Sequence, residues 1–211
     1  MSNLTLAIGR PVLADRIFGR RLAIDLVLVA AGAALTAAAA QIAVPLWPVP
    51  VTGQTLAVIL VGLSLGAVRG GISMALYAVL GIVGLPVFSE QSSGWSVIAG
   101  PTGGYIIGFI FSAVLTGWLA QLAWDRKLLR SLLATLSGTA ITFLIGLPWL
   151  AGFLGSAGYP NDLQSVLQAG FYPFILGGLI KAVLASSIIA LAWVAVGRSA
   201  KSRERKDDAA A

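Results

Sequence analysis

The chain alternates between long apolar stretches and short connections that are polar or rich in glycine and proline. Six apolar stretches stand out, at residues 22–42, 54–68, 70–84, 104–124, 128–150 and 171–196. A helix needs about 20 apolar residues to cross the hydrocarbon of a bilayer, and backbone polar groups at that depth must be satisfied within the helix. The pattern predicts an all-α membrane protein with six transmembrane helices in a single bundle, of which the second and third are short.

The basic residues predict how these helices are oriented. All of them except Lys181 lie before the first span, in the second or fourth connection, or after the last span: Arg10, Arg16, Arg20, Arg21, Arg69, Arg126, Lys127, Arg130, Arg198, Lys201, Arg203, Arg205 and Lys206. The other connections carry only Glu90 and Asp162 as charged residues. Because basic residues gather on the cytoplasmic side, we expect a multi-pass protein of a bacterial-type cytoplasmic (inner) membrane with both termini in the cytoplasm.

This orientation divides the chain into three parts. Residues 1–21 form a cytoplasmic leader, which is either an interfacial amphipathic helix or a loosely ordered segment. Residues 22–196 form the transmembrane domain, with structured first and second outer loops. Residues 197–211 form a charged cytoplasmic tail that we expect to be disordered.

Composition narrows the possible chemistry. Hydrophobic residues make up 58% of the chain and charged residues 10%, against about 25% charged residues in soluble domains. The chain has no cysteine and no histidine, so we expect no disulfide, no metal site and no cofactor, and the usual groups of an intramembrane enzyme are missing. The net charge of +6 reflects topology rather than binding of nucleic acid.

The first span is rich in small residues. Ala30, Ala34 and Ala38 recur at helical spacing, and small residues at this spacing let a second helix approach closely. The stripe therefore serves either packing within the bundle or docking of a partner membrane protein.

The outer loops have an unusual composition. Pro45, Pro48 and Pro50 exclude a regular helix from the first loop and predict an extended path. The second loop, over residues 84–105, is long and rich in glycine, and Gly103 and Gly104 allow the backbone to approach a ligand closely. These loops are either rigid surface turns or the lining of a cavity.

Lys181 is the one basic residue within a span. It lies ten residues after Phe171, or about 15 Å along a straight helix, where an unpaired lysine costs about 2.5–3.5 kcal/mol. No acidic residue of a span is near it in the sequence. Its ammonium group either extends toward the interface or pairs with a ligand, for which a carboxylate is the simplest candidate.

Several segments resemble, in order, the motifs of the BioY family of biotin transporters. They are residues 45–56 with Gly53, Gln54 and Thr55; residues 65–70; residues 81–88; residues 100–109 with Gly103, Gly104 and Tyr105; and residues 173–182 with Lys181. The resemblance as a whole covers about residues 22–196.

The resemblance implies a function and partners. BioY proteins are the substrate-specific components (S components) of energy-coupling factor (ECF) transporters, so the chain would bind biotin, without enzymatic activity of its own. A transmembrane coupling protein and a pair of ATPases would be its partners, and a homo-oligomer stays open. Ala30, Ala34 and Ala38 would dock the coupling protein.

The resemblance also implies binding roles. Lys181 would bind the carboxylate of biotin, and Gly103, Gly104 and Tyr105 would form the floor and wall of the pocket. Further contacts would come from Gln54, Thr55, Tyr77 and Ser92.

One position departs from the family pattern. The family usually has an aspartate three residues before the lysine, where this chain has Gly178. Without that carboxylate the ureido N–H groups of biotin need another acceptor, because an unmet buried polar group costs about 1–3 kcal/mol. Either Glu90, Gln91 or a backbone carbonyl substitutes, or affinity falls, or the ligand is another small carboxylate or vitamin. A membrane scaffold without a ligand is the alternative from a different class.

Overall fold

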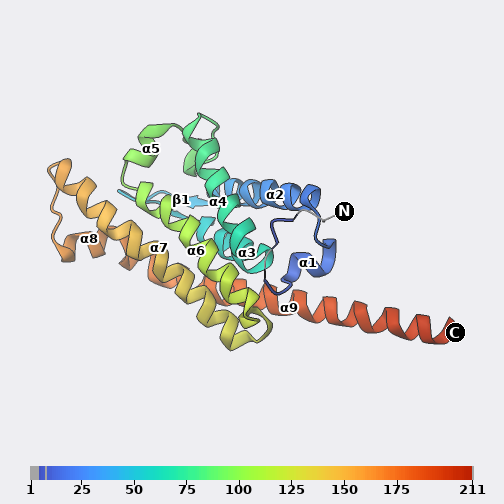
Figure 1. The fold of residues 1–211 in the computed structure, drawn as a ribbon. Coiled ribbons are helices and arrows are strands. Elements are labelled where there is room, and N and C mark those ends of the chain that lie inside the picture. The colour runs from blue at the N-terminus through green and yellow to red at the C-terminus, as the bar shows by residue number, and fades with distance from the viewer. Residues whose placement is uncertain (1–4, 8, 211) are drawn as a thin grey trace.

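The computed structural model describes residues 5–7 and 9–210, with the side chains of residues 5–7, 9–199 and 202. The chain is mostly helical (Figure 1). In order, its elements are α1 (Leu13–Phe18), α2 (Leu22–Ala40), β1 (Ala43–Val44), β2 (Val51–Thr52), α3 (Gln54–Leu65), α4 (Ala67–Ile82), η1 (Ser89–Gln91), α5 (Trp95–Ala99), α6 (Gly103–Gln121), η2 (Trp124–Arg126), α7 (Leu128–Ser156), α8 (Leu163–Gly170) and α9 (Tyr172–Ala210).

Each of the six predicted spans is a helix that begins within three residues of the expected position, while α7 and α9 extend beyond the expected ends, to Ser156 and Ala210. Four helices in the described part of the chain are long and apolar enough to cross a membrane: α2, α6, α7 and residues 172–199 of α9. The short spans two and three are the shorter apolar helices α3 and α4. The tail does not end the last helix, because α9 continues to Ala210, so the expectation of a disordered tail is wrong.

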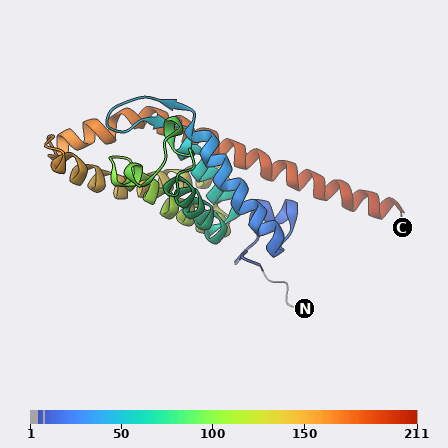
Figure 2. The ribbon, with the colours of Figure 1, turned by 90° about the horizontal axis from the view of Figure 1, so that it is seen from above.

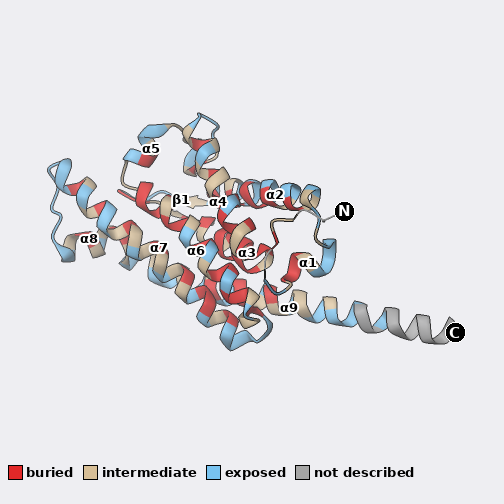
Figure 3. Cartoon of the chain, in the orientation of Figure 1, coloured by how far each residue is buried: buried red, intermediate tan, exposed pale blue. Residues whose placement is uncertain are grey.

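The core lies where α6 packs between α3, α4 and α7. Small residues allow this close packing. A side chain at Gly117 of α6 would overlap the backbone of Gly66, which turns α3 into α4 with a φ of +84°. Figure 3 shows buried positions concentrated along these helices, with exposed positions on the outward faces of α7 and α9.

The leader packs against the bundle instead of extending from it. Val12 and Leu13 are buried together with Leu63 of α3 and Ile189 of α9. Of the two expectations for the leader, the loosely ordered segment is therefore wrong over the described residues. Ile17 and Phe18 stay exposed on α1.

A buried ionic network holds the leader in place. The side chain of Arg69 is 1% exposed and pairs with Asp15 of α1 at 2.8 Å and with Asp25 of α2 at 2.9 Å. The second oxygen of Asp25 accepts hydrogen bonds from the Thr5 hydroxyl and the Leu6 N–H, both at 2.8 Å. One guanidinium of α4 thereby joins α1, α2 and the segment that precedes them.

The connecting segments opposite the two termini are structured (Figures 1 and 2). The strands β1 and β2 pair antiparallel on either side of the three prolines. The loop has no helix, as predicted, but residues 45–50 bend between the two strands and do not form a strand of their own. The second outer loop contains η1 and α5, and the last connection contains α8. The carboxylate of Asp162 caps α8 by accepting from the Ser165 N–H at 3.1 Å.

Candidate ligand-binding site

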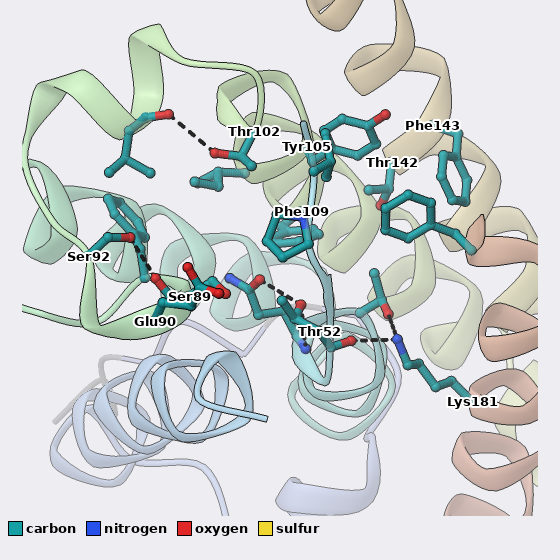
Figure 4. A pocket seen from close by; sticks show the side chains of 18 residues that line it. Thr52, Ser89, Glu90, Ser92, Thr102, Tyr105, Phe109, Thr142, Phe143 and Lys181 are labelled. Carbon is teal, nitrogen blue, oxygen red and sulfur yellow. Dashed lines mark hydrogen bonds between the residues drawn. The ribbon is translucent and has the colours of Figure 1, made fainter. Parts of the chain in front are cut away.

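A cavity lies between the structured loops and helices α3, α6, α7 and α9 (Figure 4). Its volume is about 150 Å³, roughly ten times the space that one water needs. Its lining is mainly apolar with a few polar groups, which is typical of small-molecule sites. The lining residues are Val49, Pro50, Thr52, Gln54, Thr55, Phe88, Ser89, Glu90, Ser92, Val97, Thr102, Tyr105, Ile106, Phe109, Thr142, Phe143, Phe174 and Lys181.

Lys181 brings a positive charge to this cavity from α9. Its ammonium group donates to the carbonyl oxygen of Thr52 at 2.5 Å and to the hydroxyl of Thr55 at 3.2 Å. Among the described side chains, no carboxylate lies within ion-pair distance of it. Both partners are neutral, so the cation keeps its full charge available to an anion in the cavity.

The start of α3 is held by a chain of hydrogen bonds. The Thr52 hydroxyl donates to the side-chain oxygen of Gln54 at 2.7 Å, and the Gln54 amide donates to the Tyr77 hydroxyl at 2.6 Å. Gln54 and Thr52 line the cavity, whereas Tyr77 is fully buried behind them. Tyr77 thus orients Gln54 and does not reach the lining.

The second outer loop places polar groups across the cavity from Lys181 (Figure 4). Glu90 is exposed at the edge of the cavity and has a φ of +57°. This left-handed backbone is uncommon outside glycine, asparagine and aspartate, and such strain is often found at ligand sites. The Ser92 hydroxyl donates to the Ser89 carbonyl at 2.6 Å, while the buried Ser89 hydroxyl has no hydrogen-bond partner among the described residues.

Aromatic rings form the apolar wall. Tyr105 and Phe174 lie nearly parallel with centroids 6.4 Å apart, and Phe143 meets both rings edge-on. The Tyr105 hydroxyl donates to the Gly170 carbonyl at 3.0 Å, which fixes the ring against the end of α8. A flat or aliphatic group can therefore pack on this wall while its polar end points to Lys181.

The structure brings most of the predicted residues together at this cavity. Lys181, Tyr105, Gln54, Thr55, Ser92 and Glu90 all line it. Gly103, Gly104, Tyr77 and Gln91 do not, so the placement of the two glycines as floor and wall of the pocket is not what the structure has.

The two glycines serve close packing. A side chain on Gly103 would overlap the Ile98 carbonyl, and one on Gly104 would overlap Trp149 of α7. The Gln91 N–H donates to the Gln41 side chain at 3.1 Å, away from the cavity.

Sequence reasoning missed several lining residues. Ser89, Thr102 and Thr142 are polar, and Phe109 and Phe143 are apolar. Helical spacing from Tyr105 would have found Phe109 four residues later. Thr142 and Phe143 lie on a helix that bears no predicted site residue, so only the packing of α6 on α7 reveals them.

Two predicted features lie outside the cavity. Gly178 shares the face of α9 that carries Phe174 and Lys181, and a side chain there would meet no atom within 4 Å. Ala30, Ala34 and Ala38 are all exposed on one side of α2. The docking role stays a prediction, and the exposed stripe is accessible on the surface of the described chain.

The fold and the cavity define a helical membrane protein with a small-molecule site at one end of its bundle. The chain belongs to the BioY family, whose model matches residues 9–198. It is 40% identical to a probable biotin transporter BioY of Pyrococcus horikoshii over 75% of this chain and 89% of that protein. It is 37% identical to the biotin transporter BioY2 of Lactococcus lactis over 76% and 85%.

A solved structure has a similar fold. The crystal structure of the S component for biotin from an ECF-type ABC transporter matches with a TM-score of 0.68 and 28% identity, over 79% of this chain and 88% of that one.

Proposed function

We propose that this chain is the S component of an ECF-type biotin transporter and captures biotin in the cavity beneath its outer loops. Membership of the BioY family, the named relatives and the likeness to a biotin S component support this function. The chain is a transport protein rather than an enzyme, and any ATP hydrolysis belongs to partner subunits.

The position of Lys181 indicates which residue would bind the carboxylate of biotin. Lys181 is the one cation that lines the cavity, and its ammonium group has two neutral oxygens as its hydrogen-bond partners among the described residues. The valerate carboxylate of biotin supplies the missing counter-ion. The Thr55 hydroxyl, which accepts from Lys181, can donate its own hydrogen to the same carboxylate. The fused rings then pack against Tyr105 and Phe174.

The ureido group of biotin needs acceptors at the other end. Glu90 lies across the cavity from Lys181, and the unpartnered Ser89 hydroxyl is beside it. We assign Glu90 as the acceptor that replaces the carboxylate missing at Gly178. Gln91 is a poorer candidate because its backbone turns toward Gln41.

The decisive experiment compares two ligands on two proteins. Equilibrium dialysis measures the Kd of biotin and of biotin amide, which lacks the negative charge, for the wild type and for Lys181→Met. Losing a charged hydrogen bond costs about 1.5–3 kcal/mol, or roughly 10- to 150-fold in Kd. Biotin should lose that factor in the variant, while biotin amide should bind both proteins similarly.

Lys127→Met is the matched control, because Lys127 is an exposed lysine outside the cavity. If Lys181→Met weakened the binding of biotin and of biotin amide by the same factor, Lys181 would not be the residue that binds the carboxylate. No biotin binding below the micromolar range by the wild type would reject the biotin assignment and favour a scaffold or another ligand.

A second candidate keeps the architecture with a different ligand. The observation that favours it is Gly178, which leaves open space on the ligand face of α9 where the family usually has an acid. Competition of labelled biotin by other small carboxylates and vitamins tests it. A competitor that binds more tightly than biotin would replace the first candidate.

We further propose that a transmembrane coupling protein, with its ATPase pair, docks on α2. The exposed stripe of Ala30, Ala34 and Ala38 supports this surface. Ala34→Trp should abolish biotin uptake in cells that express the partners and leave biotin binding in detergent unchanged. Normal uptake by this variant at wild-type abundance would exclude the stripe as the docking face.

The proposed topology has six crossings and both termini in the cytoplasm, as the distribution of basic residues favours. The chain has no cysteine, so single cysteines report without background. A membrane-impermeant maleimide applied to intact cells should label Ser93→Cys in the second outer loop and should not label Ser199→Cys near the inner end of α9. The reverse pattern would invert the topology.

A further inference from the structure

A second apolar groove lies outside the ligand cavity, on the flank of the bundle. Helices α2, α3 and α9 form its walls, with Ala31 and Leu35 from α2, Leu60 from α3, and Ile188 and Ala192 from α9. Its volume is about 300 Å³, and it is open to the outside of the bundle. We call it the flank groove.

A second hollow lies further along α9, toward the basic end of the bundle, and carries Arg16 and Ser199 in a mainly apolar lining. That hollow has a volume of about 530 Å³ and is lined by Arg16 and Ile17 of α1 and by Trp193, Val196 and Ser199 of α9. Ala192, Val196 and Ser199 follow at helical spacing on one face of α9. On α1, Arg16 lies one turn after Leu13, which lines the flank groove. The two hollows therefore follow one another along α9, and we treat them as one path.

The length of this path suits one leaflet of a bilayer. Ser199 lies eleven positions after Ile188, or about 16 Å along the helix. Half the hydrocarbon core of a bilayer is roughly 15 Å. The apolar part of the path also lies within the segment of α9 that is apolar enough to span a membrane, which ends at Ser199.

Arg16 supplies an unpaired charge at the polar end. The nearby cations Arg20 and Arg69 are already paired, because both form salt bridges with Asp15. Arg16 is exposed, and no described side chain pairs with it. Trp193 lines the same hollow as Arg16.

The indole N–H of Trp193 donates to Asp125 at 2.5 Å, and the guanidinium of Arg126 lies 4.7 Å from its ring centroid. Tryptophan and basic residues near the end of a spanning helix are typical of the membrane–water interface.

We propose that this path binds one anionic phospholipid of the leaflet on the basic side of the membrane. Its phosphate pairs with Arg16 and accepts from the Ser199 hydroxyl, and one acyl chain lies along the flank groove. A basic group that closes an apolar groove complements the two parts of such a lipid, whereas a partner helix would need no cation at one end only. The site goes beyond biotin binding and uses the proposed topology only to name the leaflet.

Native mass spectrometry of the delipidated, detergent-purified full chain tests the proposal. The probes are phosphatidylglycerol and phosphatidylcholine of the same acyl composition. We expect one retained phosphatidylglycerol, with phosphatidylcholine bound about fivefold more weakly, since a basic group near anionic lipid contributes about 1 kcal/mol. Arg16→Gln should remove this preference, and Arg130→Gln, an exposed arginine outside the path, should keep it.

A matched pair tests the groove itself. Ala31→Phe fills it, whereas Ala30→Phe places the same ring on the neighbouring exposed residue outside it. Phosphatidylglycerol retention should fall at least fivefold in the first variant and stay at the wild-type level in the second, with unchanged biotin binding in both as the check on folding. Equal retention of the two lipids by the wild type, or full retention by Ala31→Phe, would overturn the proposal. A dimer mass that Ala31→Phe abolishes would show a second copy as the occupant instead.

Discussion

The buried network around Arg69 predicts a large loss of stability when its cation is removed. In Arg69→Met the aliphatic part of the side chain is kept, while Asp15 and Asp25 lose their shared ion pair. Removing one member of a buried pair typically costs 3–5 kcal/mol, because a charge is left buried without compensation. The side chains of Asp15 and Asp25 are 3% and 0% exposed, so solvent cannot replace the lost guanidinium.

The hydrogen bonds that remain set the expected size of this loss. Asp25 keeps the Thr5 hydroxyl and the Leu6 N–H as donors. Asp15 keeps Arg20 and the Val12 N–H. We therefore expect the lower end of the range, a loss of about 3 kcal/mol in the free energy of unfolding.

Unfolding by sodium dodecyl sulfate in mixed micelles, followed by circular dichroism, measures this loss. Arg130→Met is the control, since Arg130 is exposed and makes no ion pair with a described residue. The double variant Arg69→Met with Asp25→Asn should regain part of the stability, because it removes one stranded charge. A cost below about 1 kcal/mol for Arg69→Met, or no recovery in the double variant, would refute the view that these buried charges depend on each other.

Three further predictions concern the cavity, a pH-dependent group and the packing of the loops. Gly178→Asp should lower the Kd of biotin about tenfold or more in equilibrium dialysis, because a carboxylate one turn before Lys181 can accept from the ureido group; unchanged or weaker binding would contradict it. Burial raises the pKa of Asp125 to about 6. The folded state therefore binds a proton that the unfolded state releases, and the melting temperature should increase as the pH is lowered from 7 to 5. Asp125→Asn should flatten this rise, and an identical profile would exclude Asp125 as its source. Gly103→Ala should cost about 1–3 kcal/mol of stability in detergent unfolding through overlap with the Ile98 carbonyl, whereas Gly177→Ala, whose nearest neighbour lies 4.0 Å away, should be neutral or stabilising.

The helices could be predicted from the sequence because hydrocarbon imposes one rule on every span. Apolar length and backbone satisfaction are local properties, so α2 and α6 begin within a residue of their expected positions. Lys181 could be identified for the same reason, since a cation at depth breaks a local rule. The leader could not be predicted, because Asp15 acquires its role from Arg69, which lies 54 residues away in the chain.

The cavity shows the same division. Lys181 and Tyr105 could be proposed from motifs, and the structure places both at the lining. The roles of Gly103 and Gly104 could not be read from their type, because glycine serves a ligand and a neighbouring helix equally well. Only the packing of α5 and α7 against α6 shows that both positions are taken up by protein atoms.

The two ends of the chain differ in ways that matter for handling the protein. Thr5 and Leu6 donate hydrogen bonds to the buried carboxylate of Asp25. A fusion partner attached close to this segment would disturb these hydrogen bonds. Helix α9 instead continues eleven residues past Ser199, or about 16 Å of helix. An affinity tag or a fluorescent reporter therefore belongs at the C-terminus, where this extension acts as a built-in spacer between the reporter and the micelle.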